Sequence, residues 1–272
     1  MTMAFKAAIF FLGVAALFPS LYDAGQRLAL MYANSPGQFV KINNFKSYEI
    51  KFADTFRNCE DGLLIESAGI AILSCDPGRE MYNTVIGIFR PGDVPGAELY
   101  AYDYTRPDAP ESETLRRIEI LNYDGGADFH TLGVVFDEAT NTLFAANHRK
   151  SGTTIEMFSL DLEEAKATHF RTIRHPLLHG PNSVTLINSN ELLVTNDHHF
   201  PIAYSRVLAT AETYLSLPIG TVVHVDVSEL VKDPTAAVEA SVVARVPFAN
   251  GIEFLNSTTL AVASTSKTSV YL

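Results

Sequence analysis

The stretch VTLINSNELLVTNDHHF, residues 184–200, contains two apolar runs of β-forming residues on either side of a polar turn. The runs are Val184–Ile187 and Leu192–Val194, and Asn188–Glu191 separate them. This pattern predicts an antiparallel hairpin. Its second strand ends in NDHH, residues 196–199, where side chains that bind protons or metals replace the apolar ones. The ending indicates a strand that leaves the core at a functional surface.

The same hairpin pattern occurs three more times along the chain. Its other copies are Gly62–Ile65 with Ile70–Leu73, Gly133–Phe136 with Leu143–Ala146, and Ile252–Leu255 with Leu260–Ala263. Three of the four hairpins precede a strand of alternating polarity, namely AELYAYDY from Ala97, TIEMFSLDL from Thr154 and TVVHVDVSEL from Thr221. A four-stranded meander that recurs roughly every 50 to 70 residues predicts an all-β fold, a β-propeller. A β-sandwich is the alternative, but it does not require the same hairpin four times.

Pairing each hairpin about its turn predicts which residues lie opposite each other. The expected pairs are Cys59 with Cys75, Thr131 with His148, Asn182 with Asn196, and Asn250 with Ser264. Equivalent strand ends of propeller blades meet at one face of the central channel. The polar residues expected at this rim are Glu60, Asp61, His130, His148, Asn182, Asn196, Asp197, His198 and Asn250.

Carboxylates mixed with Asn amides are typical of a site for a hard cation, and calcium accepts irregular oxygen ligands best. Zinc is the second choice, because His130, His148, His198 and His199 show no HxxxH-type spacing. Each residue taken alone has a structural interpretation, as a loop cap or a hydrogen-bonded histidine. Their shared position in the repeat favours a site.

Cys59 and Cys75 are the only two cysteines, and they occupy cross-strand positions of the first hairpin. A disulfide between them is therefore predicted for a protein of an oxidising compartment.

The N-terminal segment supports such a compartment. One Lys precedes an apolar run from Ala7 to Phe18, which is typical of a signal-peptide core. We expect residues 1–22 to form a signal peptide or an uncleaved signal anchor, residues 23–54 a helix and lead-in, and residues 55–272 the propeller. The protein is then secretory, extracellular or membrane-associated.

Composition bears on the size of the core and on the kind of partner. The 272 residues are 47% hydrophobic, which is enough for a sizeable core. A net charge of −11 disfavours a nucleic-acid partner.

Several motifs resemble the paraoxonase/arylesterase family, calcium-dependent six-bladed propellers that hydrolyse lactones and aryl esters. The matching stretches are CEDGLLI at 59–65, AANHRKSGTTIEMFSLDL at 145–162, FRTIRHPLLHGPNSV at 170–184, VTNDHHF at 194–200 and FANGI at 248–252. The similarity runs from about residue 55 to the end of the sequence. It implies about four blades of an expected six, preceded by an N-terminal hydrophobic helix.

The resemblance also implies roles for individual residues. Glu60, Asn182 and Asn250 would bind a catalytic calcium, and Asp61 with the carbonyl of Val134 a structural one. His148 matches the second histidine of the family's proposed dyad. Residues 207–217, and YLSLPIG at 214–220, lie where the family has a membrane-facing amphipathic helix, and with the N-terminal helix they would contact a lipid surface.

Three departures from the family pattern accompany these matches. Leu132 aligns with the principal catalytic histidine, although His130 lies two residues away. Ser183 stands where the structural calcium should have an aspartate. The chain stops at Leu272, inside the expected third strand of the fourth blade, so both calcium sites are expected to be incomplete and the chain to be truncated.

The function expected from these features is calcium-dependent hydrolysis of small hydrophobic carboxylic esters and lactones. Calcium would polarise the carbonyl, and His130 or His148 would activate the attacking water. Asn196, Asp197 and His198 would contact the ligand residues but not the ion itself. No GxSxG elbow suggests a serine nucleophile. The alternatives are a non-catalytic propeller that binds a partner, or a fragment without activity. The sequon at Asn256 predicts a glycan on the fourth hairpin.

Overall fold

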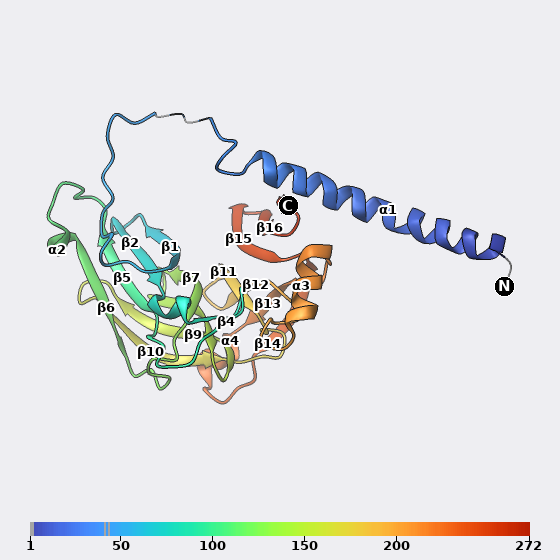
Figure 1. Ribbon diagram of the computed structural model, residues 1–272. Helices are drawn as coiled ribbons and strands as arrows, with labels where there is room; N and C mark the ends of the chain where they lie inside the picture. Colours follow the sequence, from blue (N-terminus) through green and yellow to red (C-terminus); the bar gives the residue numbers. More distant parts are fainter. Residues whose placement is uncertain (1–2, 41, 43) are drawn as a thin grey trace. The chain divides into compact units, whose positions relative to one another are not determined.

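The computed structural model describes residues 3–40, 42 and 44–272 and divides into two units, Met1–Glu49 and Ile50–Leu272. The first unit contains helix α1 (Met3–Ala33), coloured blue in Figure 1. This helix continues across the boundary expected at residue 22. Residues 1 and 2 of the expected leader, and residues 41 and 43 of the lead-in, lie outside the described residues. None of the helices in the described part of the chain has the length and apolar character needed to cross a membrane.

The second unit is built from antiparallel meanders that follow one another along the chain (Figure 1). The first meander consists of β1 (Cys59–Ile65), β2 (Ile70–Cys75), β5 (Glu98–Asp103) and β6 (Leu115–Leu121). The second consists of β7 (Thr131–Asp137), β8 (Thr142–Arg149), β9 (Gly152–Asp161) and β10 (Lys166–Ile173). The third consists of β11 (Pro181–Asn188), β12 (Glu191–Asn196), β13 (Thr221–Asp226) and β14 (Glu239–Arg245). The fourth consists of β15 (Ala249–Asn256), β16 (Thr259–Ser264) and β17 (Ser269–Tyr271).

Shorter elements lie in the connections between these strands. They are the 3-10 helix η1 (Pro77–Glu80), the paired strands β3 (Tyr82–Asn83) and β4 (Ile88–Phe89), and the helices α2 (Glu111–Thr114), α3 (Arg206–Leu215) and α4 (Ser228–Lys232).

The first strands of successive meanders lie beside each other, since β1 contacts β7, β7 contacts β11, and β11 contacts β15. This is the arrangement of innermost strands in a propeller, where each meander is one blade. In addition, β6 and β10 pair in parallel and join the first two blades into one sheet. The predicted all-β propeller is therefore confirmed, with four blades in the described part of the chain.

The blades pack face to face because both faces of a blade are apolar. In β8, Leu143 and Ala145 face the first blade, whereas Phe144 and Ala146 face the third. All four side chains are fully buried. Alternate residues of a strand point to opposite faces, so a strand buried on both sides is apolar without interruption. Each large side chain buried in this way contributes about 1.5–3 kcal/mol.

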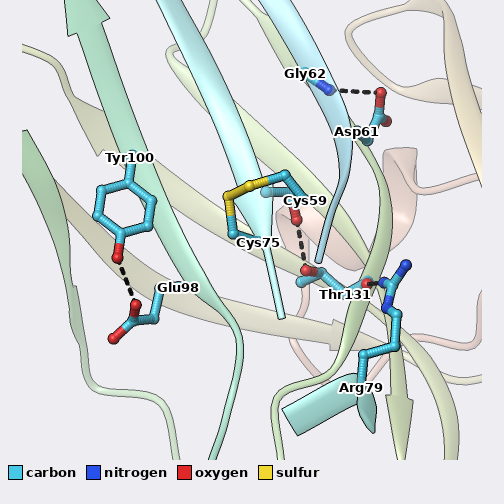
Figure 2. The surroundings of a disulfide bond; sticks show 9 residues. Cys59, Asp61, Gly62, Cys75, Arg79, Glu98, Tyr100 and Thr131 are labelled. Carbon is cyan, nitrogen blue, oxygen red and sulfur yellow. Dashed lines mark hydrogen bonds between the residues drawn. A yellow bond between two sulfur atoms is a disulfide. The ribbon is translucent and has the colours of Figure 1, made fainter. Parts of the chain in front are cut away.

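The predicted disulfide is present between Cys59 and Cys75, which are cross-strand partners in β1 and β2 (Figure 2). The other predicted pairs are wrong by one residue. Thr131 lies opposite Asn147, Pro181 opposite Asn196, and Ala249 opposite Ser264.

The cause of the one-residue error is a bulge at the start of each innermost strand. The register shifts between Cys59 and Asp61, Thr131 and Val134, Pro181 and Val184, and Ala249 and Ile252. A bulge inserts an unpaired residue that redirects a side chain, and bulges are frequent next to functional sites.

Candidate functional site

The four bulges begin at equivalent positions, one residue into each innermost strand. These positions hold Glu60, Leu132, Asn182 and Asn250. The residue released from the ladder points away from its regular partner, so the bulges place these four side chains at the same level of the channel. Three of the four carry oxygen atoms, and those three are the predicted ligands of a catalytic calcium.

These three residues line one cavity of about 100 Å³, which we call the oxygen-lined cavity. Its lining residues are Glu60, Asp61, Gly133, Asn182, Ser183, Asn250 and Gly251. Four of the predicted metal ligands thus come together from three blades. Val134 is not part of this lining; its backbone N–H donates to Asp61 Oδ2 at 2.8 Å.

Gly133 allows the second and third blades to approach closely at this cavity. A Cβ atom at residue 133 would lie 2.6 Å from the carbonyl oxygen of Asn182 and 2.7 Å from the Cα of Ser183. Real Cβ atoms do not approach backbone atoms so closely. Any other residue would therefore push the start of β11 away from β7.

The donor set of the oxygen-lined cavity fits calcium. One carboxylate from Glu60 and two carboxamides from Asn182 and Asn250 are hard oxygen ligands. Zinc fits less well, since the lining of this cavity contains neither histidine nor cysteine. The described residues contain no group of three His, Cys, Asp or Glu side chains able to share an ion. Within the cavity, Glu60 forms an ion pair with Arg79, and Asn250 Nδ2 donates to Thr265 Oγ1 at 2.8 Å.

His130 is held by a buried carboxylate. Its Nδ1 lies 3.2 Å from Asp76 Oδ2, and the two side chains are 3% and 2% exposed. The other oxygen of Asp76 accepts a hydrogen bond from the Gly78 N–H at 2.9 Å. In contrast, His130 Nε2 is buried and has no hydrogen-bond partner among the described residues, although Asp128 Oδ1 lies 4.0 Å away. A carboxylate at Nδ1 favours the tautomer with a free lone pair on Nε2, the arrangement of a general base.

His148 is bonded through both ring nitrogens. Nε2 lies 2.6 Å from the carbonyl oxygen of Pro181, and Nδ1 is hydrogen-bonded to the hydroxyl of Thr84. Since a carbonyl only accepts, Nε2 carries the proton and Nδ1 accepts from Thr84. Burial lowers the pKa of His148, against the opposing effect of the Pro181 carbonyl. The ring is therefore neutral at physiological pH.

Both histidines line a second, small cavity of about 10 Å³, which we call the histidine cavity. It is also lined by Asp76, Arg79, Tyr82, Asn83, Thr84, Thr131 and Leu132. This volume is on the order of one water molecule. Leu132 closes one side with an apolar surface, and His130 reaches the same cavity from two residues earlier in the chain.

A third cavity, the wide pocket, has a volume of about 460 Å³ and shares His148 with the histidine cavity. Asp197 and His198 line it, with Tyr82, Ile202 and Tyr204 as apolar surface. Its size falls within the usual range for small-molecule sites.

Asp197 and His198 form a pair at the wide pocket. His198 Nδ1 lies 3.2 Å from Asp197 Oδ1, and His198 Nε2 lies 2.7 Å from Thr213 Oγ1 of α3. Burial opposes the charged form of His198, but the hydrogen bond to Asp197 and the negative charges of Asp197 and Glu212 together outweigh it and raise the pKa of His198. Asp197 Oδ2 is buried and has no hydrogen-bond partner within the described part of the chain.

Asn196 lies outside all three cavities, although sequence analysis placed it at the rim. Its Oδ1 accepts from the Gly180 N–H at 2.9 Å, and its Nδ2 donates to the Leu177 carbonyl and to Thr221 Oγ1. These bonds fix the loop that leads into β11. The predicted single rim is thus divided among three neighbouring cavities.

A buried polar network supports His130 from inside the second blade. Asn147 Oδ1 accepts from the His130 backbone N–H at 2.8 Å, and Asn147 Nδ2 donates to Glu156 Oε1 at 3.1 Å. Burial opposes the ionisation of Glu156, but hydrogen bonds from His169, Thr154 and Thr172 outweigh it and lower its pKa to about 2.

This network predicts an acid-sensitive contribution to stability. The folded-state pKa of Glu156 is depressed from 4.5 to about 2. Its contribution is therefore complete above about pH 4.5 and is lost as the pH falls toward 2. It amounts to about 3 kcal/mol. We expect Glu156→Gln to lower the free energy of unfolding by about this amount at pH 7, measured by urea denaturation.

The difference between Glu156→Gln and the parent protein should shrink as unfolding is measured at lower pH. Glu119→Gln, which changes an exposed carboxylate of β6, serves as the control and should leave stability within about 0.5 kcal/mol. Equal stability of the Glu156 variant and the parent protein at pH 7 would contradict the prediction.

The site predicted from the sequence lacks three residues that contact Glu60 or the two histidines, namely Asp76, Arg79 and Thr84. They lie in the irregular segment between β2 and β5, where no periodic pattern marks them. The one available signal is the position of Asp76, directly after the strand that ends at Cys75. That placement puts it at the same end of the blade as Glu60.

Comparison with known proteins identifies the relatives of this chain. A family model described as Arylesterase matches residues 91–272, more than half of the chain. The chain belongs to the arylesterase family. The family resemblance seen in the sequence is thereby confirmed.

Two curated relatives align with part of this arylesterase-family chain at 27–30% identity. Serum paraoxonase/arylesterase 2 of Gallus gallus is 30% identical over 141 residues, covering 51% of this chain and 38% of the relative. Serum paraoxonase/lactonase 3 of Oryctolagus cuniculus is 27% identical over 204 residues, covering 73% and 53%. The chain thus spans about half or less of the length of these relatives.

A solved structure that resembles the chain is the periplasmic gluconolactonase of Pseudomonas aeruginosa. The two are 12% identical with a TM-score of 0.44, covering 76% of this chain and 50% of the other.

Proposed function

We propose that this arylesterase-family chain hydrolyses carboxylic esters and lactones in a calcium-dependent reaction. The observation that carries the proposal is the grouping of Glu60, Asn182 and Asn250 around one cavity. Arg79 contacts Glu60 and also lines the histidine cavity, so the oxygen ligands and the candidate base are neighbours.

Glu60, Asn182 and Asn250 would hold a calcium ion, which when bound polarises the carbonyl group of an ester. Asp61 accepts N–H groups from Gly62 and Val134 and shapes the wall of the oxygen-lined cavity. A second, structural ion at Asp61 and the Val134 carbonyl stays a prediction, and Ser183 would give it a weaker ligand than aspartate.

His130 is the proposed general base. Asp76 accepts the Nδ1–H of His130, so Nε2 can take a proton from a water molecule in the histidine cavity. Asp76 also stabilises the imidazolium that forms. His148 positions the site: its proton is held by the Pro181 carbonyl, and its Nδ1 orients the hydroxyl of Thr84. Asp197 and His198 would orient the substrate in the wide pocket.

The wide pocket suits a small hydrophobic ester or lactone. Burial raises the pKa of Tyr82 to about 12, so its phenol stays protonated as a hydrogen-bond donor at the pocket wall. Ile202 and Tyr204 supply apolar contact for an acyl or aryl group.

Secretion and contact with a lipid surface belong to the same proposal. The apolar leader and the disulfide support a secretory route. On α3, Val207, Tyr214 and Leu215 are exposed and apolar, which favours docking at a lipid interface. Asn256 is exposed beside the turn between β15 and β16, where a glycan can be attached.

The experiment that tests the proposal measures hydrolysis of phenyl acetate and of γ-butyrolactone by the full chain, before and after exhaustive treatment with EGTA. We expect chelation to remove at least 90% of the turnover, in the manner of other metal-assisted hydrolyses, and added Ca²⁺ to restore it. Magnesium should restore less, because it demands a smaller octahedral site. Hydrolysis that persists unchanged after chelation would reject the calcium mechanism.

A non-catalytic binding propeller is the second candidate. Two features favour it. Leu132, at the bulge of the second blade, is apolar, and Glu60 is already held in an ion pair with Arg79. This candidate predicts no turnover above buffer for either substrate, while an ester analogue still binds the wide pocket in equilibrium dialysis.

A further inference from the structure

Arg79 engages the oxygen-lined cavity from the 3-10 helix η1. Its Nη1 forms an ion pair with Glu60 Oε2, and its Nη2 donates to the backbone carbonyl of Thr131. Figure 2 shows the guanidinium beside Thr131, close to the start of β7. The Arg79 side chain is 16% exposed. A fixed positive charge is therefore bonded to the one carboxylate among the three candidate ligands of a catalytic ion.

A guanidinium group and a calcium ion use the same lone pairs of a carboxylate. A divalent cation that approaches Glu60 must displace Arg79 from Oε2 or bind beside it, where like charges repel. Arginine is charged at every physiological pH, so deprotonation cannot remove this competitor.

We propose that Arg79 is an internal competitor of calcium for Glu60. This inference rests on the proposed calcium-dependent function and adds regulation to the same site. Arg79 holds the carboxylate in the absence of a divalent cation, and the side chain leaves Glu60 when the cation binds. The competition sets the calcium concentration at which the oxygen-lined cavity fills.

The position of Arg79 connects cation binding to both histidines. Asp76, which orients His130, also caps η1 by accepting the Gly78 N–H, and the Arg79 N–H donates to the Asp76 carbonyl at 3.1 Å. Thr84, the partner of His148, follows on the same segment. Release of Arg79 from Glu60 therefore loosens the segment that holds the partners of both rings.

The test is calorimetric titration of CaCl₂ into the chelator-treated full chain and into Arg79→Met. Methionine keeps an unbranched apolar stem like that of arginine and adds neither charge nor oxygen, so a tighter site cannot come from an additional ligand. We expect the calcium dissociation constant of Arg79→Met to fall about 10-fold or more, which corresponds to removal of one competing ion pair.

Arg106→Met is the matched control. Arg106 also pairs with a carboxylate, Asp103, at 2.8 Å and donates to a backbone carbonyl, that of Glu113, at 2.9 Å. It lies three residues after the end of β5 and lines none of the three cavities. Arg106→Met changes the net charge by the same amount as Arg79→Met and should leave calcium affinity within about twofold of the parent protein. Unchanged or weaker affinity in Arg79→Met, or an equal gain in Arg106→Met, would overturn the inference.

A second measurement uses the unaltered protein and does not depend on the folding of any variant. We expect saturating Ca²⁺ to increase amide hydrogen exchange in residues 76–84, because η1 loses the anchor that Arg79 provides. Calcium binding with unchanged or slower exchange in this segment would also reject the inference.

These results separate the inference from the proposed function. Calcium-dependent hydrolysis together with unchanged affinity in Arg79→Met would leave the function standing and reject the competition. Tighter calcium binding in Arg79→Met without hydrolysis by either protein would support the competition and reject the hydrolase.

Discussion

Replacement of His130 by glutamine is expected to lower kcat/KM for phenyl acetate by about 10²–10⁴-fold, the usual contribution of a general base. His130 is the histidine whose buried Nε2 makes no hydrogen bond to any described residue and lies beside the histidine cavity, while Asp76 holds its Nδ1. Glutamine retains similar size and polarity but cannot take up a proton. The measurement is steady-state hydrolysis of phenyl acetate by the variant and by the parent protein at the same calcium concentration.

Two further histidine variants serve as a control and a comparison for His130→Gln. His224 pairs with Glu191 at 2.6 Å on β13, so His224→Gln removes a histidine–carboxylate pair that lines none of the three cavities. It should retain full activity. His148→Gln should lose less activity than His130→Gln, because both nitrogens of His148 already have partners. The opposite order would transfer the role of base to His148.

Substitution of Glu60 by glutamine is expected to weaken calcium binding on the order of 100-fold, because affinity follows the number of charged ligands. Glu60 is the one carboxylate among the three candidate ligands of the catalytic ion, since Asn182 and Asn250 contribute neutral amides. Hydrolysis at limiting calcium should fall in proportion. Isothermal titration with CaCl₂ measures the affinity, and circular dichroism verifies the fold.

Glu98→Gln is the matched control for Glu60→Gln. Glu98 pairs with Arg117 at 3.0 Å on β5, so its variant also breaks one Glu–Arg ion pair in the first blade. Calcium affinity should remain unchanged. If Glu60→Gln binds calcium as tightly as the parent protein, the oxygen-lined cavity is not the calcium site.

Much of the fold follows from local patterns that need no three-dimensional information. Paired apolar runs around polar turns predict the hairpins, and repetition of the hairpin predicts the propeller. The grouping of Glu60, Asn182 and Asn250 follows from repetition as well, because equivalent strand ends meet in a propeller. The disulfide between Cys59 and Cys75 follows from cross-strand pairing in the same way.

Other features depend on contacts that local patterns do not encode. The bulges shift three of the four predicted pairings by one residue, and polar-apolar alternation does not reveal an inserted residue. Asp76, Arg79 and Thr84 reach the site through an irregular segment whose path depends on tertiary contacts. Asn196 resembles a ligand in the sequence, yet its three hydrogen bonds to Gly180, Leu177 and Thr221 engage it fully.

The close approach at Gly133 has a consequence for ion selectivity. The missing side chain lets the carbonyl of Asn182 come within 2.6 Å of the place where a Cβ would stand. The distance between the second and third blades therefore depends on Gly133, which is not one of the candidate ligands. Ionic radius would be selected here by backbone spacing, and the ligands themselves would select only charge.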